Sequence, residues 1–478
     1  MRIRPTIAQT RKPVRLRRGP WACALLLMVA GLLPARQAAQ AQTSPSLQAE
    51  LERLKIVVEV KQERIEALER ELATVRGQLN VYRDRKIVAD IQREVERLRG
   101  LRAKRPVEMA PLTSEVLDHL LEKEIGDRHS DAEFRGWELM LKHLGLIPPA
   151  MEMRPFIKAL YSEQLAGVYD DETKKLYVSD KFDLESTMAK VILAHEICHA
   201  LQDQQFNLTS SPIELKTNDD RAVAALSVVE GDATILMADY LRENMSWRLL
   251  KELPGLMMMD QKQLATAPRF ITESLIFPYM QGMMFVMNFT MDWGPRARDR
   301  LMRDLPRSTE QVLHFEKYAG PQKDEPTDIS LDAVTSSPLM PVDNRYNNVA
   351  GEFGVKCFLS EQLPPSDAET AAEGWDGDRA LFGGRRDGDY ALAWLSIWDS
   401  DKDAREFADA LIRYFKAQRP ELAERADKGE GIVWLADQKG SIAIVRKNDR
   451  VACVHSNDEK RTAGLLDELL AIKVGRVR

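Results

Sequence analysis

The sequence predicts an α+β protein with a mostly helical core that contains one short β-hairpin. A coiled coil precedes this core and a small α+β domain follows it. Three observations support this fold class. Heptads of apolar residues run through the N-terminal part of the chain. Two short strand-like runs flank a polar turn between residues 166 and 180. From about residue 365, strand-like runs alternate with two helical segments.

The chain has 478 residues, 44% of them hydrophobic, which is enough to form two or three domains. Residues 1–41 contain seven Arg, one Lys and no acid, a charge of +8. Because the whole chain carries −6, the remainder carries about −14. An acidic protein repels phosphate, so we expect no nucleic-acid partner.

The basic N-terminus precedes a 13-residue apolar run, Trp21–Leu33, and small residues at Ala39 and Ala41. This order is typical of a bacterial-type secretory signal peptide cleaved after Ala41. The alternative is a membrane anchor, but 13 apolar residues are too few to span a bilayer unaided. We therefore expect residues 1–41 to be a signal peptide. The mature chain would then be periplasmic or extracellular, with no stable membrane span.

Three cysteines remain after such a cleavage: Cys198, Cys357 and Cys453. A sparse and odd set does not predict a disulfide scaffold. If one pair forms, the sequence favours Cys357 with Cys453.

Residues 46–105 form the predicted coiled coil. One seam position of its heptads is taken by Leu47, Leu54, Leu68, Val75 and Tyr82, and the other by Leu51, Val58, Ile65, Leu72 and Leu79. Five heptads predict a coiled coil or a long helical hairpin, through which the chain could form a homo-oligomer. The alternative is a solvated helix lying on its own domain. Gly100 and the basic segment up to Pro106 predict a linker.

The helical core is predicted over residues 107–350. Three helices are expected between residues 113 and 165, starting near Thr113, Ser130 and Met153. The hairpin Ala166–Asp180 follows, and then helices at 184–206 and 222–242. A Met-rich segment, 274–291, has no charged residue and is expected to be a buried helix. The last domain, 365–478, is predicted with the order β-β-α-β-β-β-α.

The segment "AHEICHALQDQ" contains the first candidate for chemistry. On a helix, His195 and His199 are about 400° apart and so point to one face, where two imidazoles can bind one zinc ion. Glu196 is offset by about 100°, which suits a general base better than a ligand. The alternative is a buried helix that contains two histidines by chance. Cys198 is expected to pack as a small apolar residue.

Glu230 is the preferred third ligand, from "ALSVVEGDATILM". It falls on the apolar face of its predicted helix, where a lone carboxylate would be costly without a metal. Asp232 is the alternative ligand, and Gly231 leaves room for two helices to approach closely. Asp203 either orients an imidazole from outside the metal ligands or faces solvent.

"HEICH" followed by "EGDAT" on another helix resembles the gluzincin branch of zincin metallopeptidases, the thermolysin-like group. The resemblance implies a zincin-like core in which His195, His199 and Glu230 hold zinc and Glu196 activates water. It also implies that the edge of the hairpin pairs with a peptide substrate. The chain departs from that group at Thr234, where those enzymes have an Asp; Asp232 could replace it.

Three further segments look similar to exported bacterial zinc metallopeptidases: "HALQDQQF", "PRSTEQVLHFEKY" and "GWDGDRA…IWDSDKDAREFADAL". Peptide hydrolysis also needs a donor for the developing oxyanion. His314, which lies in the second of these segments, is the first candidate, and Tyr279 and Tyr318 are the next. The remaining histidines (His119, His129, His143 and His455) are expected to be structural.

The predicted function is that of an exported zinc-dependent endopeptidase acting on peptide or protein substrates. One alternative is a non-catalytic scaffold of the cell envelope with a structural zinc site and an interacting coiled coil. Glu196 argues against it, because a structural site needs no base. A second alternative is a zinc amidase acting on a non-protein amide.

Overall fold

The computed structural model describes residues 45–164, 167–179, 183–244, 262–385, 387–426 and 431–475. The predicted signal peptide, 1–41, lies outside these residues. The protein is α+β: a mostly helical region with a small sheet precedes a seven-stranded antiparallel sheet with helices. The chain divides into two compact units, one ending at Leu79 and one beginning at Asn80.

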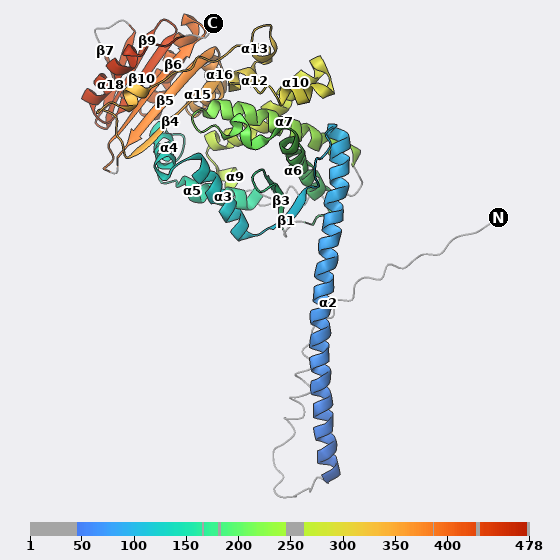
Figure 1. Ribbon diagram of the computed structural model, residues 1–478. Helices are drawn as coiled ribbons and strands as arrows, with labels where there is room; N and C mark the ends of the chain where they lie inside the picture. Colours follow the sequence, from blue (N-terminus) through green and yellow to red (C-terminus); the bar gives the residue numbers. More distant parts are fainter. Residues whose placement is uncertain are drawn as a thin grey trace, which may run out of the picture. The chain divides into compact units, whose positions relative to one another are not determined.

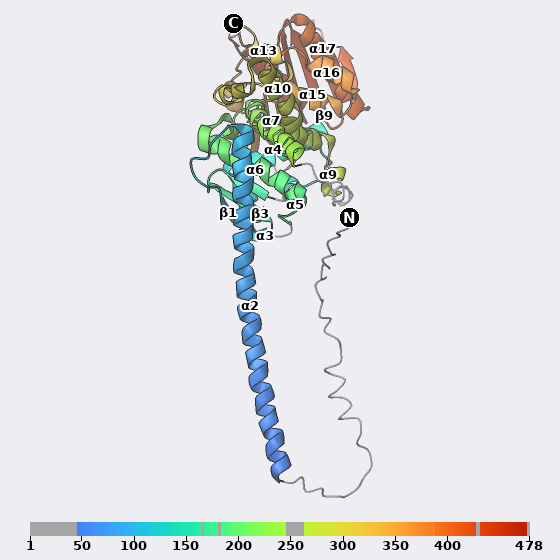
Figure 2. The same cartoon turned by 90° about the vertical axis from the view of Figure 1, so that its right-hand side faces the viewer.

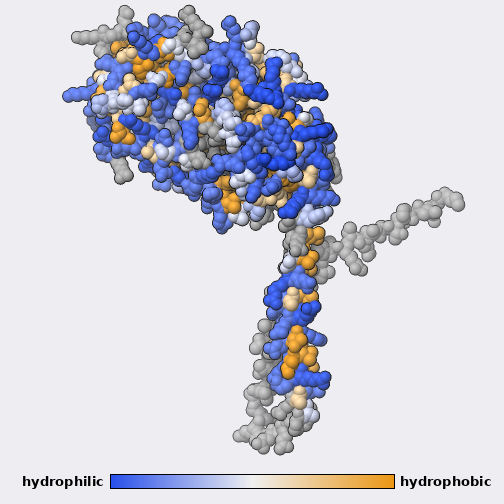
Figure 3. All heavy atoms as spheres, in the orientation of Figure 1, coloured by the Kyte–Doolittle hydropathy of each residue, from blue (hydrophilic) through white to orange (hydrophobic). Residues whose placement is uncertain are grey.

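Helix α2, Pro45–Arg99, is one continuous helix and not a hairpin. Before Asn80 its seam side chains are exposed; Leu54 is 56%, Ile65 50% and Leu72 48% exposed. Hydrophobic side chains are therefore visible along the surface of this helix (Figure 3). The partner that would cover this seam stays a prediction.

After Asn80 the same helix belongs to the second unit. Val88, Ile91 and Val95 are buried there in a cluster with side chains of α6 (Thr187–Phe206) and β3 (Lys175–Ser179). In the sequence, the apolar stripe shifts its phase near Ile87, close to this boundary. The last part of the predicted coiled coil is therefore a core helix of the second unit.

The predicted linker after Gly100 is held against α6. The backbone N–H groups of Lys104 and Arg105 donate to Gln204 Oε1 at 2.7 and 3.1 Å. Gln205 Nε2 donates to the carbonyl of Arg102 at 2.6 Å. These bonds tie the end of α2 to the helix that carries His195 and His199.

Three helices form between residues 113 and 165 as predicted: α3 (Ser114–Arg128), α4 (Asp131–Leu144) and α5 (Met153–Gln164). Thr113 and Ser130 cap the first two, and Ser130 forms a capping box with Glu133. The predicted hairpin is also present, as β2 (Gly167–Asp170) and β3. An unpredicted strand, β1 (Glu108–Leu112), pairs parallel to β3, so the sheet order is β1-β3-β2.

The side chain of Ser186 caps the start of helix α6. The 3-10 turns η1 (Leu208–Ser210) and η2 (Pro212–Glu214) follow this helix. Helix α7 runs Asp219–Glu243 and α9 Lys262–Thr266. Shorter elements follow α10 (Arg269–Trp293): η3 (Pro295–Ala297), α11 (Arg298–Leu301), α12 (Thr309–Leu313), α13 (Phe315–Ala319) and α14 (Asp332–Thr335).

Helix α10, Arg269–Trp293, contains the Met-rich segment and is only half buried. Phe277, Phe285 and Phe289 pack against α7, whereas Met284 and Met291 are 53% and 79% exposed. The prediction of a fully buried helix is wrong, because α10 lies against α7 with one face only. No helix in the described ranges is long and apolar enough to cross a membrane.

The C-terminal sheet has the order β4-β5-β6-β10-β9-β8-β7, with every pair antiparallel (Figure 1). Its strands are β4 (Asn344–Asn348), β5 (Trp375–Gly384), β6 (Tyr390–Trp398), β7 (Ala423–Ala426), β8 (Ile432–Asp437), β9 (Gly440–Lys447) and β10 (Arg450–Ser456). Strands β4 and β7 were not predicted. Helices α15 (Gly351–Ser360) and α16 (Pro365–Ala372) lie between β4 and β5 in the chain.

Helices pack against both faces of this sheet. Figure 2 shows α16 and α17 (Asp401–Gln418) beside it. On one face, α17 packs Phe407 and Tyr414 against Trp394. On the other, α18 (Glu459–Ala471) packs Leu465 against Leu395. Alternate residues of β6 thus enter different cores, which explains why the whole strand is buried.

All three described cysteines are free and buried, so the Cys357–Cys453 pairing is wrong. The Cys357 thiol instead donates to Glu273 Oε2 at 3.2 Å. Cys198 is fully buried among apolar side chains of α6, α7 and β3, which confirms its packing role.

Candidate metal centre

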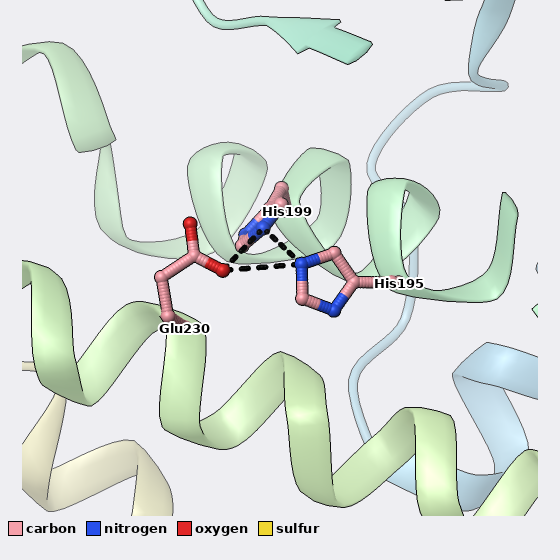
Figure 4. A group of neighbouring side chains, drawn as sticks. All are labelled: His195, His199 and Glu230. Carbon is pink, nitrogen blue, oxygen red and sulfur yellow. Dashed lines mark hydrogen bonds and ion pairs between the residues drawn. The ribbon is translucent and has the colours of Figure 1, made fainter. Parts of the chain in front are cut away.

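His195, His199 and Glu230 meet in one group (Figure 4). The two histidines project from consecutive turns of α6, and Glu230 reaches them from α7. His195 Nε2 lies 3.0 Å from His199 Nε2 and 3.1 Å from Glu230 Oε2, and His199 Nε2 lies 3.4 Å from the same oxygen. Three donor atoms from two helices therefore converge on one point.

These separations fit a zinc site. With zinc bonds near 2.0–2.1 Å and tetrahedral angles, two ligand atoms should be roughly 3.3 Å apart. The three observed separations scatter about that value. The donor set, two imidazole nitrogens and one carboxylate oxygen, is also one that zinc accepts with a fourth position left open.

Gln202 orients His199. Its Oε1 lies 2.9 Å from His199 Nδ1, and since an amide oxygen only accepts, Nδ1 carries the proton. The lone pair of Nε2 is then free to face the group, as metal binding requires. Gln202 is fully buried, and its Nε2 donates to the carbonyl of Val229 and to Asp232 Oδ2.

Asp232 is not part of the ligand group. Its Oδ2 accepts from Arg99 Nε at 2.7 Å and its Oδ1 from Arg298 Nη1 at 3.0 Å, and all three side chains are buried. Burial opposes the charge on Asp232, but the two guanidinium groups hold the pKa of its carboxyl below the usual range. Asp232 is therefore not a ligand in this group; it contacts Gln202, which in turn contacts His199.

Asp203 serves a different contact. Its carboxylate accepts from the Tyr169 hydroxyl and from Lys174 Nζ, each at 2.8 Å, and from the backbone of Leu208. It joins the end of α6 to the hairpin. The side chain that orients an imidazole is its neighbour Gln202. One feature of the sequence could have indicated this role of Gln202: it is an uncharged amide three residues after His199 on the same buried helix.

The charges of Glu230 and of the two histidines favour a positive charge at the centre of this group. Burial opposes ionisation of Glu230, but His199 and His195 lower its pKa to about 2. Burial also opposes the charge on His199, yet Glu230 and Glu196 raise its pKa to about 9. The negative charge of Glu230 therefore favours a positive charge beside it, as a bound cation would supply.

Glu196 lies between this group and the edge strand β2. Its Oε2 accepts from the backbone N–H of Tyr169 at 2.9 Å. Burial raises the pKa of its carboxyl, and the two histidines partly offset that effect. A carboxyl held beside imidazoles, with a raised pKa, is suited to exchange protons.

Gly231 allows a close approach of two helices, but the neighbour is α10 and not α6. A Cβ on Gly231 would lie 2.2 Å from the carbonyl carbon of Gly282, and a Cβ on Gly282 would lie 2.0 Å from the Ser227 oxygen. The two helix backbones therefore touch. This contact brings Tyr279, one turn before Gly282, to the ligand group.

Tyr279 stacks on His195 with ring centroids 6.0 Å apart. Burial of its hydroxyl end, together with Glu230 and Glu196, raises the pKa of Tyr279 above its ordinary value. The hydroxyl therefore stays protonated and can donate a hydrogen bond beside the candidate metal position, while the side chain as a whole is 42% exposed.

The structure does not bring His314 to this group. Its Nε2 lies 2.8 Å from Glu352 Oε1, and the contacts of its side chain in the described residues do not include the three ligands. Tyr318 donates its hydroxyl to the carbonyl of Asp304. Two of the other histidines pack as expected: His143 stacks on Tyr390, and His455 accepts from the same tyrosine.

A second acidic cluster, of Glu310, Asp324 and Asp399, surrounds a lysine. Lys317 Nζ lies 2.5, 3.0 and 2.8 Å from the three carboxylates. The ammonium group supplies the positive charge that these acids need, so we assign this cluster a structural role.

One family model matches the chain: a domain of unknown function (DUF8575), over residues 339–466. The match covers the C-terminal sheet and its helices, less than half of the chain, and it does not include the candidate metal centre. No curated protein matches the sequence. No solved structure matches it either.

Proposed function

We propose that the protein is an exported zinc-dependent peptidase of gluzincin type. The observation that carries this proposal is the convergence of His195, His199 and Glu230 beside the carboxyl of Glu196. A structural zinc site would need the three ligands but not an adjacent buried carboxyl, which disfavours the scaffold alternative.

In this proposal His195, His199 and Glu230 hold the zinc ion. Bound there, zinc would supply Lewis-acid activation of a water molecule and of the substrate carbonyl. Glu196 takes a proton from the attacking water and delivers it to the nitrogen of the leaving amine. Gln202 keeps the Nε2 lone pair of His199 directed at the ligand position throughout.

Tyr279 replaces His314 as our candidate for the oxyanion donor. Its neutral hydroxyl lies on the Glu230 side of the group, and its ring stacks on His195. A donor placed where negative charge develops stabilises the transition state more than the substrate.

The edge strand β2 favours a peptide over other amides. In the three-stranded sheet β2 has β3 on one side only, and the Tyr169 N–H on its outer edge points to Glu196. An extended peptide added to this edge would lie next to the proposed base. A zinc amidase acting on a non-protein amide would not need such an edge.

The test is cleavage of unfolded casein by the mature chain, by Glu196→Gln and by Tyr279→Phe, each with one equivalent of zinc. We expect Glu196→Gln to lose cleavage while keeping zinc. Tyr279→Phe should lower kcat by about 10²-fold with little change in KM. Cleavage by Glu196→Gln at the rate of the parent protein would refute the proposal. Zinc-dependent hydrolysis of non-protein amides alone would favour the amidase.

A further inference from the structure

A cavity of about 500 Å³ opens on the side of α7 where the α6–α7 connection meets the segment that follows α11. Its walls come from the end of α6, from η1 and η2, and from residues 302–307. Three arginines line it: Arg221, Arg303 and Arg307. The predicted functions leave this cavity unused.

Two of the three arginines of this cavity, Arg221 and Arg303, have no acidic partner among the described residues. Among the described lining residues the one acid is Asp304, and Lys323 Nζ lies 2.7 Å from its carboxylate. Arg307 pairs with Glu325 at 3.1 Å. Arg303 donates to the carbonyl of Asp299 and lies over the ring of Phe206. Neither of these last two contacts neutralises its charge.

Arg221 carries the strongest indication of a ligand. Its Nε is buried without a hydrogen-bond partner, and its guanidinium forms no ion pair within the described ranges. Ser211, another lining residue, likewise has a buried hydroxyl without a hydrogen-bond partner. A buried donor without an acceptor destabilises the folded protein, and more strongly when the donor is charged. An acceptor brought by a ligand would remove this destabilisation.

We infer that this cavity binds a small molecule through an oxyanion, a carboxylate or a phosphate group. The planar fork of a guanidinium matches both anions with two parallel hydrogen bonds. Arg221 would form that pair, Ser211 would donate a third bond, and Arg303 would add charge. The site does not depend on the proposed peptidase activity.

The position of the cavity connects it to the candidate metal centre. Phe206 belongs to α6, which carries the two histidines, and Val229 on the cavity wall precedes Glu230 on α7. An anion bound here would join the segments that end α6 and begin α7. It would therefore stabilise the packing of the two ligand-bearing helices.

The experiment is a calorimetric titration of the full mature chain, freed of metal, with inorganic phosphate and with succinate. Sodium chloride keeps the ionic strength constant, because non-specific attraction is screened by salt. We expect saturable binding of at least one anion, and the preferred anion identifies the group that the site takes. Arg221→Gln should weaken binding by about tenfold or more.

Arg385→Gln and His199→Ala serve as controls, and Arg303→Gln is a second test variant. Arg385→Gln removes an exposed arginine at the end of β5 and should bind as the parent chain does. Arg303→Gln replaces Arg221→Gln if circular dichroism shows that the latter is unfolded, and it too should weaken binding. The same titration on His199→Ala tests whether the anion binds to residual zinc. This variant should hold almost no zinc and should still bind the anion. Binding that does not saturate, or that Arg221→Gln and Arg303→Gln leave unchanged, would overturn the inference.

Discussion

At the residue scale, Gln202 shows that the candidate metal centre depends on residues that are not themselves candidate ligands. It joins His199 to a buried network in which Asp232 is held between Arg99 and Arg298. Removing one member would leave a buried polar group of its neighbour without a hydrogen-bond partner. The network also fixes which nitrogen of His199 faces the ligand position.

We predict that Gln202→Ala lowers zinc affinity by about 10- to 100-fold, because His199 loses the acceptor that fixes its tautomer and ring orientation. Competition with a chromogenic chelator measures this. Gln204→Ala removes an amide from the same helix that contacts only the backbone of the preceding segment, and it should keep the parent affinity. Equal affinities for the two variants would show that Gln202 does not orient the ligand.

Because Asp220 is buried, we predict that the free energy of unfolding depends on pH. It is 2% exposed, its Oδ1 accepts from the Thr309 backbone at 3.0 Å, and burial raises its pKa to about 7. The folded protein therefore favours the protonated acid. Its contribution to stability is complete below the unfolded pKa of about 4 and is lost as the pH rises through 7.

The free energy of unfolding of the parent chain should accordingly fall between pH 4 and pH 8 relative to that of Asp220→Asn, whose side chain stays neutral. Between these two pH values, the difference in free energy of unfolding between the parent chain and Asp220→Asn should change by about a few kcal/mol. Denaturant unfolding at a series of pH values measures it. A difference that stays constant, or that grows with pH, would contradict the assignment.

At the element scale, the contact between α7 and α10 positions Tyr279. Ala at position 282 would place its Cβ 2.0 Å from the Ser227 oxygen, so Gly282→Ala must push the helices apart. We expect a loss of stability of about 1–3 kcal/mol and a lower kcat, because Tyr279 moves with α10.

The matched control is Gly126→Ala in α3, where an added Cβ meets no atom within 4 Å. Removing a helical glycine should there raise stability by roughly 0.5–1 kcal/mol. Thermal unfolding of both variants provides the comparison. A Gly282→Ala protein as stable as the Gly126→Ala protein would mean that the helices are not in backbone contact.

The exposed seam of α2 is the second prediction at this scale. Leu68 and Leu72 are 47% and 48% exposed and occupy the two seam positions. If α2 forms a homo-oligomeric coiled coil, Leu68→Lys with Leu72→Lys should convert the oligomer to a monomer, because two charges would be buried in the seam. Light scattering coupled to size exclusion measures the mass.

The control for the seam is Glu69→Lys, which introduces the same charge at an outer position and should leave the oligomer intact. A monomeric parent chain would show that α2 has another role.

At the scale of the whole molecule, local patterns predicted the elements better than their contacts. The i, i+4 histidines, the single carboxylate on the apolar face of α7 and the capped starts of α3 and α4 are visible within one or two helical turns. The hairpin β2–β3 was predicted for the same reason. Strand β1 was missed because it contains Pro111 and pairs with a strand more than 60 residues later in the chain.

The parts that sequence could not predict depend on distant partners. Arg99 and Asp232 are 133 positions apart, and the sequence around neither residue predicts their ion pair. The contact of Gly231 with α10, and hence the place of Tyr279, depends on how three helices pack. His314 was favoured from its segment alone, whereas the fold places its imidazole against Glu352.

The central claim is that His195, His199 and Glu230 hold one zinc ion. The most direct measurement is zinc per chain, by mass spectrometry of the metal after dialysis against zinc and then against buffer, for the parent chain, Glu196→Gln and His199→Ala. We predict about one zinc per chain in the first two and almost none in His199→Ala, because two remaining ligands bind zinc weakly. A parent chain without zinc, or a His199→Ala chain that retains it, would contradict the claim.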